Sequence, residues 1–385
     1  MKEKGNQQVL VYLLIGTIMF SWILVYPQKI PAQVEVSAQA AILMDVESGR
    51  VLYEKNADQP LRIASITKIM TAILALELGN LKDKVTATRN AVGKEGSSIY
   101  LRLGETLTLE DMLYGLMLRS GNDAAVAIAE HIGGSVEGFV FLMNQRAEEL
   151  GMMNTVFSNP HGLDDHEEHY STARDMAILT AYALKNEEFA KIARTKRKTA
   201  PLEGENWDRV WHNKNKLLYM YPYADGVKTG YTKRAKRTLV SSATKDGHQL
   251  VAVTLNAPDD WNDHIKLFEY GFNQFTKVTL AREKEKITDE RFLDKGGYFQ
   301  ATRSFSYPLI RGERIKREYV VHPELEERLS RDEPVPFPAG YLIFSLEDKE
   351  IGRVPLAFIT KQGASSFWHR FSYLLEKLVG GPLHG

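Results

Sequence analysis

The residues between Arg62 and Gly79 constrain the fold of this chain most, because a helix must begin among them. Apolar side chains recur there at helical spacing, at Ile69, Met70, Ile73, Leu74 and Leu76. Gly79 ends the pattern. Ser65 therefore lies in the first turn, where unpaired backbone N–H groups and the helix dipole favour a developing negative charge. Lys68 follows three residues later, so its amine lies on the same face as the Ser65 hydroxyl.

A serine followed three residues later by a lysine is a common pattern that does not identify a nucleophile by itself. Ser242 and Lys245 repeat it within residues that we predict to form a strand. The assignment of Ser65 therefore depends on which other polar groups the fold brings to it.

A second polar stretch, Ser120-Gly121-Asn122, lies on a tight connection between two predicted helices. The first helix runs from Thr108 to Leu118, and the second begins at Asp123. Such a connection can aim two polar side chains into one cleft. Taken alone, these residues are better explained by an ordinary Asn/Ser turn with local hydrogen bonds.

A third stretch, Lys228-Thr229-Gly230, lies on a predicted strand. Two further strands follow, at 238–244 and 249–255, and the tight turn at Asp246-Gly247 joins them into a hairpin. A glycine within a strand leaves room for another group to approach the backbone.

Hairpins and helices together predict a mixed α/β fold with an antiparallel sheet. A first hairpin turns at Glu47-Ser48-Gly49, and helices are expected at 136–150, 171–184 and 261–275. From about 278 to 359 the pattern changes to short strands with charged turns and prolines, which predicts a small all-β domain. A chain of 385 residues also suggests more than one domain.

Composition excludes several classes of function. The sequence has no cysteine, which rules out a thiol nucleophile, a disulfide framework and thiolate metal sites. Lysine plus arginine (49) balances aspartate plus glutamate (49), which argues against a nucleic-acid partner. His131, His212, Asp263 and His264 have no ligand spacing, so we predict no metal and no cofactor.

Both ends of the chain carry patterns typical of membrane association. Lys2 and Lys4 precede an apolar run, 9–26, which indicates export; its length leaves open whether a peptidase removes it. Near the other end, 365–379 has apolar residues at helical spacing with charges between them. We expect this segment to lie in the membrane interface, with a helix docked on the β-rich domain as the alternative.

The three polar stretches, in this order, resemble the signature of penicillin-binding proteins and serine β-lactamases: Ser65-x-x-Lys68, Ser120-x-Asn122 and Lys228-Thr229-Gly230. Flanking residues such as 159–163, 169–176 and 225–232 are similar to those of low-molecular-mass D-alanyl-D-alanine carboxypeptidases. The segments 235–240 and 261–264 look like the branch that endospore formers use for spore-cortex peptidoglycan.

The resemblance implies an architecture of four parts. Residues 1–32 would be a signal peptide or signal anchor, and 33–276 the penicillin-binding protein/β-lactamase-like domain, with an antiparallel sheet, helices on both sides and a helical cluster. Residues 277–362 would form the all-β domain, and 363–385 an amphipathic anchor. The expected location is the extracytoplasmic side of a membrane, with the forespore envelope as one option.

Cleaving a D-Ala-D-Ala bond needs a nucleophile, a proton shuttle, an oxyanion site and a grip on the terminal carboxylate. Ser65 would supply the hydroxyl, and Lys68 can be the base only if its pKa is lowered. The resemblance implies these further roles: Lys228 supplies positive charge, Ser120 relays a proton, Asn122 orients Lys68 and substrate, the Ser65 and Tyr231 N–H groups bind the oxyanion, and Lys228, Thr229 and Gly230 bind substrate.

The sequence departs from the family pattern just after the third motif. Many relatives have glycine where Lys236 stands and a small residue at Thr238. We hypothesise that Arg237 helps to bind the terminal carboxylate; an arginine on the strand surface is the alternative. His161 is either catalytic or structural, and Asn213 and Lys214 either line the rim or support the fold.

The sequence thus predicts a serine carboxypeptidase that removes the terminal D-alanine from peptidoglycan stem pentapeptides, with β-lactams acylating the same serine. One alternative is a serine β-lactamase-like hydrolase, although 155–175 contains no Glu-x-x-x-Asn deacylation motif. The other is a non-catalytic wall-binding protein, which the intact motifs disfavour.

Overall fold

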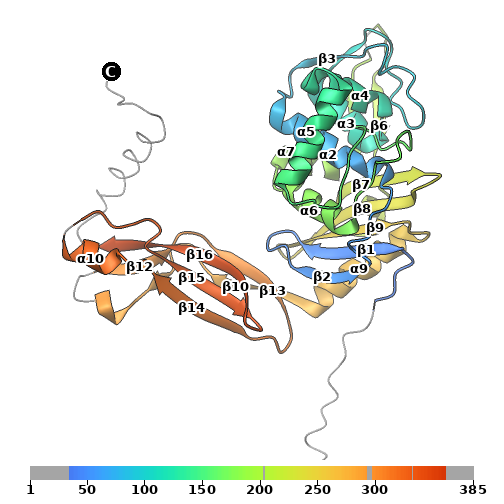
Figure 1. Ribbon diagram of the computed structural model, residues 1–385. Coiled ribbons are helices and arrows are strands. Elements are labelled where there is room, and N and C mark those ends of the chain that lie inside the picture. The colour runs from blue at the N-terminus through green and yellow to red at the C-terminus, as the bar shows by residue number, and fades with distance from the viewer. Residues whose placement is uncertain (1–33, 203, 293–296, 332, 361–385) are drawn as a thin grey trace, which may run out of the picture. The chain divides into compact units, whose positions relative to one another are not determined.

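The computed structural model describes residues 34–202, 204–292, 297–331 and 333–360 (Figure 1). The predicted leader at 1–32 and the predicted anchor at 363–385 lie outside these residues. Within them, no single helix is long and apolar enough to cross a bilayer; α4 (Asn122–Gly133) and α5 (Val136–Glu149) pass that test only as a pair bent by 84°.

A five-stranded antiparallel sheet organises the first part of the chain. Its strand order is β2 (Val51–Lys55), β1 (Ala40–Asp45), β9 (His248–Leu255), β8 (Lys236–Lys245) and β7 (Ala224–Thr232). Both predicted hairpins are confirmed, and at the turn of the second one Lys245 lies opposite His248. The strand that carries Lys228 lies at one edge of the sheet.

Helices cover both faces of this sheet, which explains why its strands are apolar on both sides. Along β9, Val251 and Val253 belong to the large helical core, whereas Thr254 bonds His264 of α9 (Asp260–Gln274). On the other face lies α6 (Ala173–Ala183), which Thr172 caps by accepting from the Asp175 N–H. The predicted mixed α/β class is therefore confirmed.

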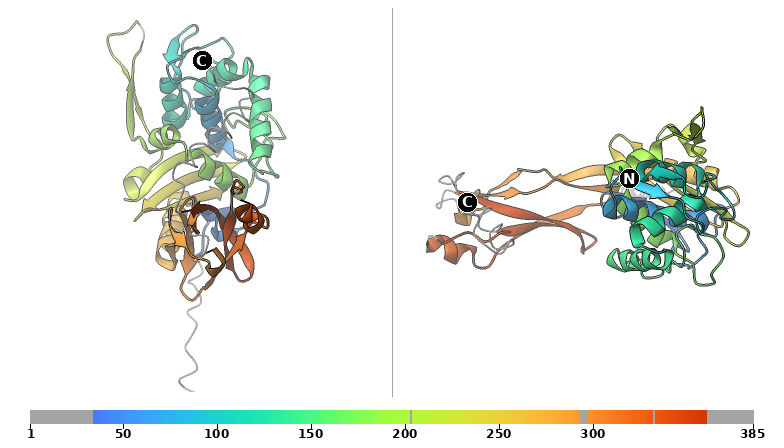
Figure 2. Two further views of the ribbon diagram at one scale, coloured as in Figure 1. Left: turned by 90° about the vertical axis from the view of Figure 1, so that its left-hand side faces the viewer. Right: turned by 90° about the horizontal axis from the view of Figure 1, so that it is seen from above.

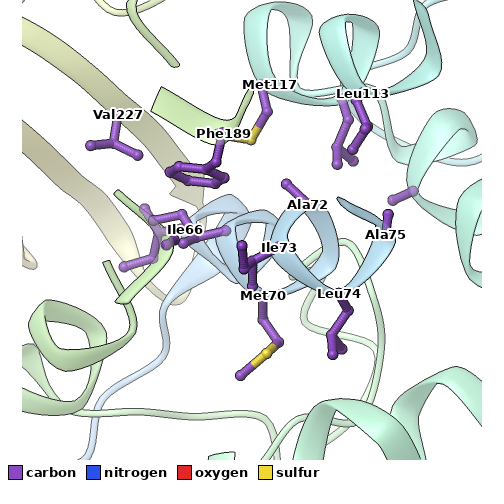
Figure 3. Packing of buried hydrophobic residues seen from close by; sticks show 14 of the residues in the cluster. Ile66, Met70, Ala72, Ile73, Leu74, Ala75, Leu113, Met117, Phe189 and Val227 are labelled. Carbon is purple, nitrogen blue, oxygen red and sulfur yellow. The ribbon is translucent and has the colours of Figure 1, made fainter. Parts of the chain in front are cut away.

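The helical layer lies on the same face as α6 (Figure 2, left). It contains α2 (Lys68–Leu78), α3 (Leu109–Arg119), α4, α5, α7 (Glu187–Arg194) and the short α8 (Leu217–Met220). Thr108 caps α3, as the sequence predicts. Figure 3 shows how this layer meets the sheet, with side chains from the turn before α2 and from α2, α3, α7 and β7 in one core: Ile66, Met70, Ile73, Met117, Phe189 and Val227.

The turn that contains Ser65 differs in detail from the prediction. Ala64–Thr67 forms a 3₁₀ turn, η1, and the α-helix begins at Lys68. Ala64 itself has a φ of 50°, a left-handed conformation that costs about 1–2 kcal/mol for a residue with a Cβ. Packing around Ala64 must therefore hold Ser65 in place.

Short polar strands were not predicted. They are β3 (Lys84–Thr86), β4 (Thr106–Thr108), β5 (Arg197–Ala200) and β6 (Arg209–His212), which pair as β3–β4 and β5–β6. Strands of three or four residues with only one or two apolar side chains each are too short to show a hydrophobic period in the sequence. Their pairing depends on tertiary contacts.

Residues from Phe275 onward are mostly strand. The strand β10 (Phe275–Ala281) pairs with β13 (Phe305–Ile310), and a five-stranded sheet has the order β11 (Lys286–Ile287), β12 (Gly297–Ala301), β16 (Lys349–Thr360), β15 (Gly340–Leu346) and β14 (Ile315–Val321). This part of the chain also contains a 3₁₀ turn, η2 (Glu290–Phe292), and the helix α10 (Leu325–Ser330). It has a separate hydrophobic core, which includes Phe299, Phe344 and Leu356.

Candidate active site

The amine of Lys68 lies at the centre of the candidate site. Its Nζ is 3.0 Å from Ser65 Oγ, 2.7 Å from Asn122 Oδ1 and 2.5 Å from the backbone oxygen of His161. These three contacts come from a 3₁₀ turn, a helix start and a loop. The lysine side chain is fully buried.

Two hydrogen bonds to the loop that contains Glu95 and Ser97 fix the direction of the Asn122 side-chain amide. Asn122 Nδ2 donates to the Glu95 carbonyl at 2.6 Å, and the Asn122 N–H donates to the Ser97 carbonyl at 2.7 Å. The amide oxygen must then face Lys68. This amide oxygen and the His161 carbonyl oxygen can both only accept hydrogen bonds.

The environment of Lys68 disfavours its charged form. Burial is the largest cause, followed by the positive charges of Lys228 and Lys214, and together they hold the pKa of Lys68 well below its usual range. Asp123 acts in the opposite direction and is the smaller influence. A neutral amine keeps two hydrogens for the two acceptors and directs its lone pair at the Ser65 hydroxyl.

The strand β7 brings the third motif against the same turn. Lys228 is buried and donates to the Thr229 carbonyl at 2.8 Å; burial and the charge of Lys214 lower the pKa of Lys228 to about 7. A Cβ at Gly230 would lie 3.0 Å from the Ser65 backbone nitrogen. No larger residue fits at position 230 without a shift, because this strand passes close to the backbone of Ser65, the candidate nucleophile.

The loop from 158 to 171 packs against the turn that contains Ser65. The Thr71 hydroxyl donates to the Pro160 carbonyl at 2.6 Å, and the Thr67 hydroxyl contacts His169 Nε2 at 2.8 Å. A Cβ at Gly162 would meet the Ala64 carbonyl oxygen at 1.9 Å. This loop therefore fixes the strained residue that precedes Ser65.

His161 contributes its backbone rather than its ring to this cluster. Its ring accepts from the Leu163 N–H at 3.2 Å, and burial together with Lys68 lowers its pKa to about 3. The neutral ring thus supports the loop. Its carbonyl contact with Lys68 has no signal in the sequence.

Ser120 lies at the end of α3 in a left-handed conformation with a φ of 64°. Its Oγ is buried and hydrogen-bonds to none of the described residues. The left-handed turn explains how two residues of one short connection, Ser120 and Asn122, can both face inward.

Arg237 is opposite Tyr231 in the β7–β8 ladder, and Leu239 is opposite Thr229. Arg237 and Thr229 thus share one face as diagonal neighbours. The guanidinium donates to Asp260 Oδ1 at 2.7 Å and lies over the Trp261 ring. Lys236, where relatives often have glycine, has a φ of 58°, which is the conformation that glycine favours.

Lys214 is a site residue that the sequence left undecided between rim and fold. Its Nζ donates to Ser97 Oγ at 2.8 Å, and its charge lowers the pKa of both Lys68 and Lys228. Asn213 instead donates to the Ala193 and Thr195 carbonyls and supports the end of α7. Among the described residues, no group of three or more His, Asp or Glu side chains could hold a metal ion.

We predict that Gly162→Ala lowers the free energy of unfolding by about 3 kcal/mol, from the left-handed φ of 85° and the clash with Ala64 together. Gly151→Ala is the matched control. Its φ is 74° and nothing lies within 4 Å of the added carbon, so it should lose only about 1 kcal/mol. Urea unfolding measures both, and equal losses would contradict the close contact.

Comparison with known proteins agrees with this geometry. Residues 27–259 match the profile of the peptidase S11 family, described as D-alanyl-D-alanine carboxypeptidase. The chain is 41% identical to D-alanyl-D-alanine carboxypeptidase DacF of Bacillus subtilis, over 67% of this chain and 69% of that protein. It is 35% identical to DacC of Escherichia coli, over 87% and 86%.

A solved structure also matches over most of the chain. Penicillin binding protein 5 from Haemophilus influenzae has a TM-score of 0.70 and 29% sequence identity, covering 86% of this chain and 98% of that one. The chain therefore belongs to the peptidase S11 family of D-alanyl-D-alanine carboxypeptidases.

Proposed function

We propose that this protein removes the terminal D-alanine from peptidoglycan stem pentapeptides through an acyl-serine intermediate, and that β-lactams acylate the same serine. The observation that carries the proposal is the contact between Ser65 Oγ and a buried Lys68 amine whose other two partners are acceptors. Family membership supports the substrate class.

In acylation, Ser65 Oγ attacks the carbonyl carbon of the penultimate D-alanine and its proton passes to the Lys68 amine. The carbonyl oxygen becomes negative, and the backbone N–H groups of Ser65 and Tyr231 would stabilise it. When the C–N bond breaks, Ser120 would relay a proton from Lys68 to the leaving D-alanine amine. Water then hydrolyses the ester by the reverse transfers.

Positive charge near the strand β7 would hold the substrate's terminal carboxylate. Lys228 and Thr229 would contact it from the edge strand, with Gly230 giving access to the backbone. Arg237 would approach from the same face as Thr229, and its ion pair with Asp260 would orient the guanidinium.

The two alternative functions would give different results with penicillin and with the stem peptide. A β-lactamase-like hydrolase would release its penicillin adduct quickly, whereas the carboxypeptidase would retain it. A wall-binding protein would bind the stem peptide without releasing D-alanine. The low pKa of Lys68 favours an enzyme, because a buried neutral lysine has a use in catalysis that binding does not need.

The remaining assignments stay proposals from sequence. We propose a leader at 1–32, a catalytic domain at 33–276, a β-rich domain at 277–362 and an amphipathic membrane anchor at 363–385. The protein would then act on the extracytoplasmic side of a membrane, in maturation of the cell wall or of the spore cortex.

Replacing the nucleophile tests the mechanism. Ser65→Ala should reduce D-alanine release from a pentapeptide by about a thousandfold or more and abolish the penicillin adduct in the intact mass spectrum. Ser242→Ala is the control, since that serine repeats the Ser-x-x-Lys pattern but bonds Asp225 from within β8. Activity that survives Ser65→Ala would refute the mechanism.

The charge state of Lys68 predicts a pH dependence. Because Lys68 must be neutral to accept the proton, acylation is lost as pH falls through its pKa. Removing a neighbouring positive charge raises that pKa, so the acidic limb of the pH–rate profile should move to higher pH. Lys228→Met should move it further than Lys214→Met, in the order of their influence. Unmoved profiles for penicillin acylation would contradict a base tuned by these charges.

Arg237→Ala should lower kcat/KM on a diacyl-D-Ala-D-Ala tripeptide by about tenfold. The control is the same tripeptide with its terminal carboxylate amidated, which should react slowly and equally with both proteins. An unchanged kcat/KM on the acid form would exclude Arg237 from carboxylate binding.

A further inference from the structure

One exposed carboxylate joins two segments that flank the candidate nucleophile. Glu167 accepts from Arg62 Nη2 at 2.8 Å, and from both terminal nitrogens of Arg234 at 2.7 Å each. Arg62 also donates to the backbone oxygens of His166 and Glu167, at 3.0 and 3.3 Å. Glu167 therefore ties the 158–171 loop to both arginines, and its pKa is held at about 2, chiefly by Arg234.

The two arginines lie at equal distances in sequence from the two residues proposed to bind the oxyanion. Arg62 lies three residues before Ser65, and Arg234 lies three residues after Tyr231, in the turn between β7 and β8. The strands β7 and β8 also contact the residues just before Ser65 directly. Thr238 Oγ1 donates to the Ile63 carbonyl at 3.0 Å, and the Gly230 backbone approaches the Ser65 nitrogen.

We infer that Glu167 is a positioning residue for the oxyanion site. The contacts of Thr238 and Gly230 hold the two segments together next to Ser65. The ion pairs of Glu167 with Arg62 and Arg234 hold the same segments together a second time, three residues away from Ser65 and Tyr231. Two points of attachment fix both the separation and the relative tilt of the segments that carry the Ser65 and Tyr231 N–H groups. This inference rests on the proposed function, which assigns those two N–H groups to the oxyanion.

Physical chemistry argues for an effect on rate rather than on stability. The Glu167 side chain is 79% exposed, and exposed ion pairs contribute little to folding. Oxyanion stabilisation depends instead on donors held at the right distance from a developing charge, so a small displacement is costly. Asp164 lies 3.7 Å from Arg62 and can partly replace Glu167 there.

The test compares full-length wild type with Glu167→Gln, which keeps the shape and removes the charge. At low salt we expect the rate of penicillin acylation and kcat on the tripeptide to fall about fivefold, with KM nearly unchanged. The ratio of wild-type to variant rates should approach one at about 1 M salt, because salt screens an exposed bridge. Arg234→Gln should give a similar loss, and the double variant should be no worse than either single one.

Glu324→Gln is the matched control. It removes an exposed carboxylate that pairs with Arg328 at 2.7 Å, at α10, which carries neither Ser65 nor Tyr231. It should leave the acylation rate unchanged at every salt concentration. A Glu167→Gln rate equal to wild type at low salt would overturn the inference, and so would a loss that persists at high salt with a lowered Tm. If wild type itself forms no penicillin adduct, the proposed function fails instead.

Discussion

The burial of the Lys68 side chain is the constraint on which the whole candidate site depends. A buried ammonium with no negatively charged group among its three contacts is costly, so this environment lowers the pKa of Lys68 and favours its neutral form. The Asn122 amide oxygen and the His161 carbonyl take the two hydrogens. In the neutral amine only the lone pair then remains for Ser65, and this is the arrangement that the proposed role of Lys68 as a base requires.

That arrangement requires several backbone segments to meet at one point, and glycine permits the closest approaches. Gly162 touches the Ala64 carbonyl, and Gly230 touches the Ser65 nitrogen. Ala64 carries the left-handed strain between them. A turn packed closely on two sides in this way leaves Ser65 little freedom, which is what its proposed role as a preorganised nucleophile needs.

The loop from 158 to 171 connects these features. It supplies the carbonyl that orients Lys68, the glycine beside Ala64, the histidine that contacts Thr67 and the carboxylate that joins Arg62 to Arg234. The loop is thus a scaffold for the turn that contains Ser65. Its many turn-forming residues are explained by the number of backbone groups it must present in fixed directions.

The three ordered motifs identified the family through their resemblance to it. Local propensity predicted the antiparallel hairpins, the helix α2 and the tight turn that contains Ser120 and Asn122, whereas the 3₁₀ turn before α2 was not predicted. The tertiary structure decided what depends on distant segments. Examples are the His161 carbonyl on Lys68, the influence of Lys214 on two pKa values, and the ion pair between Arg237 and Asp260. Ser65 and Ser242 share one local pattern, and only folding separates them: one is brought to a buried amine, the other to Asp225. The physical reason is that burial and electrostatic coupling are properties of the assembled core, which no short stretch of sequence contains.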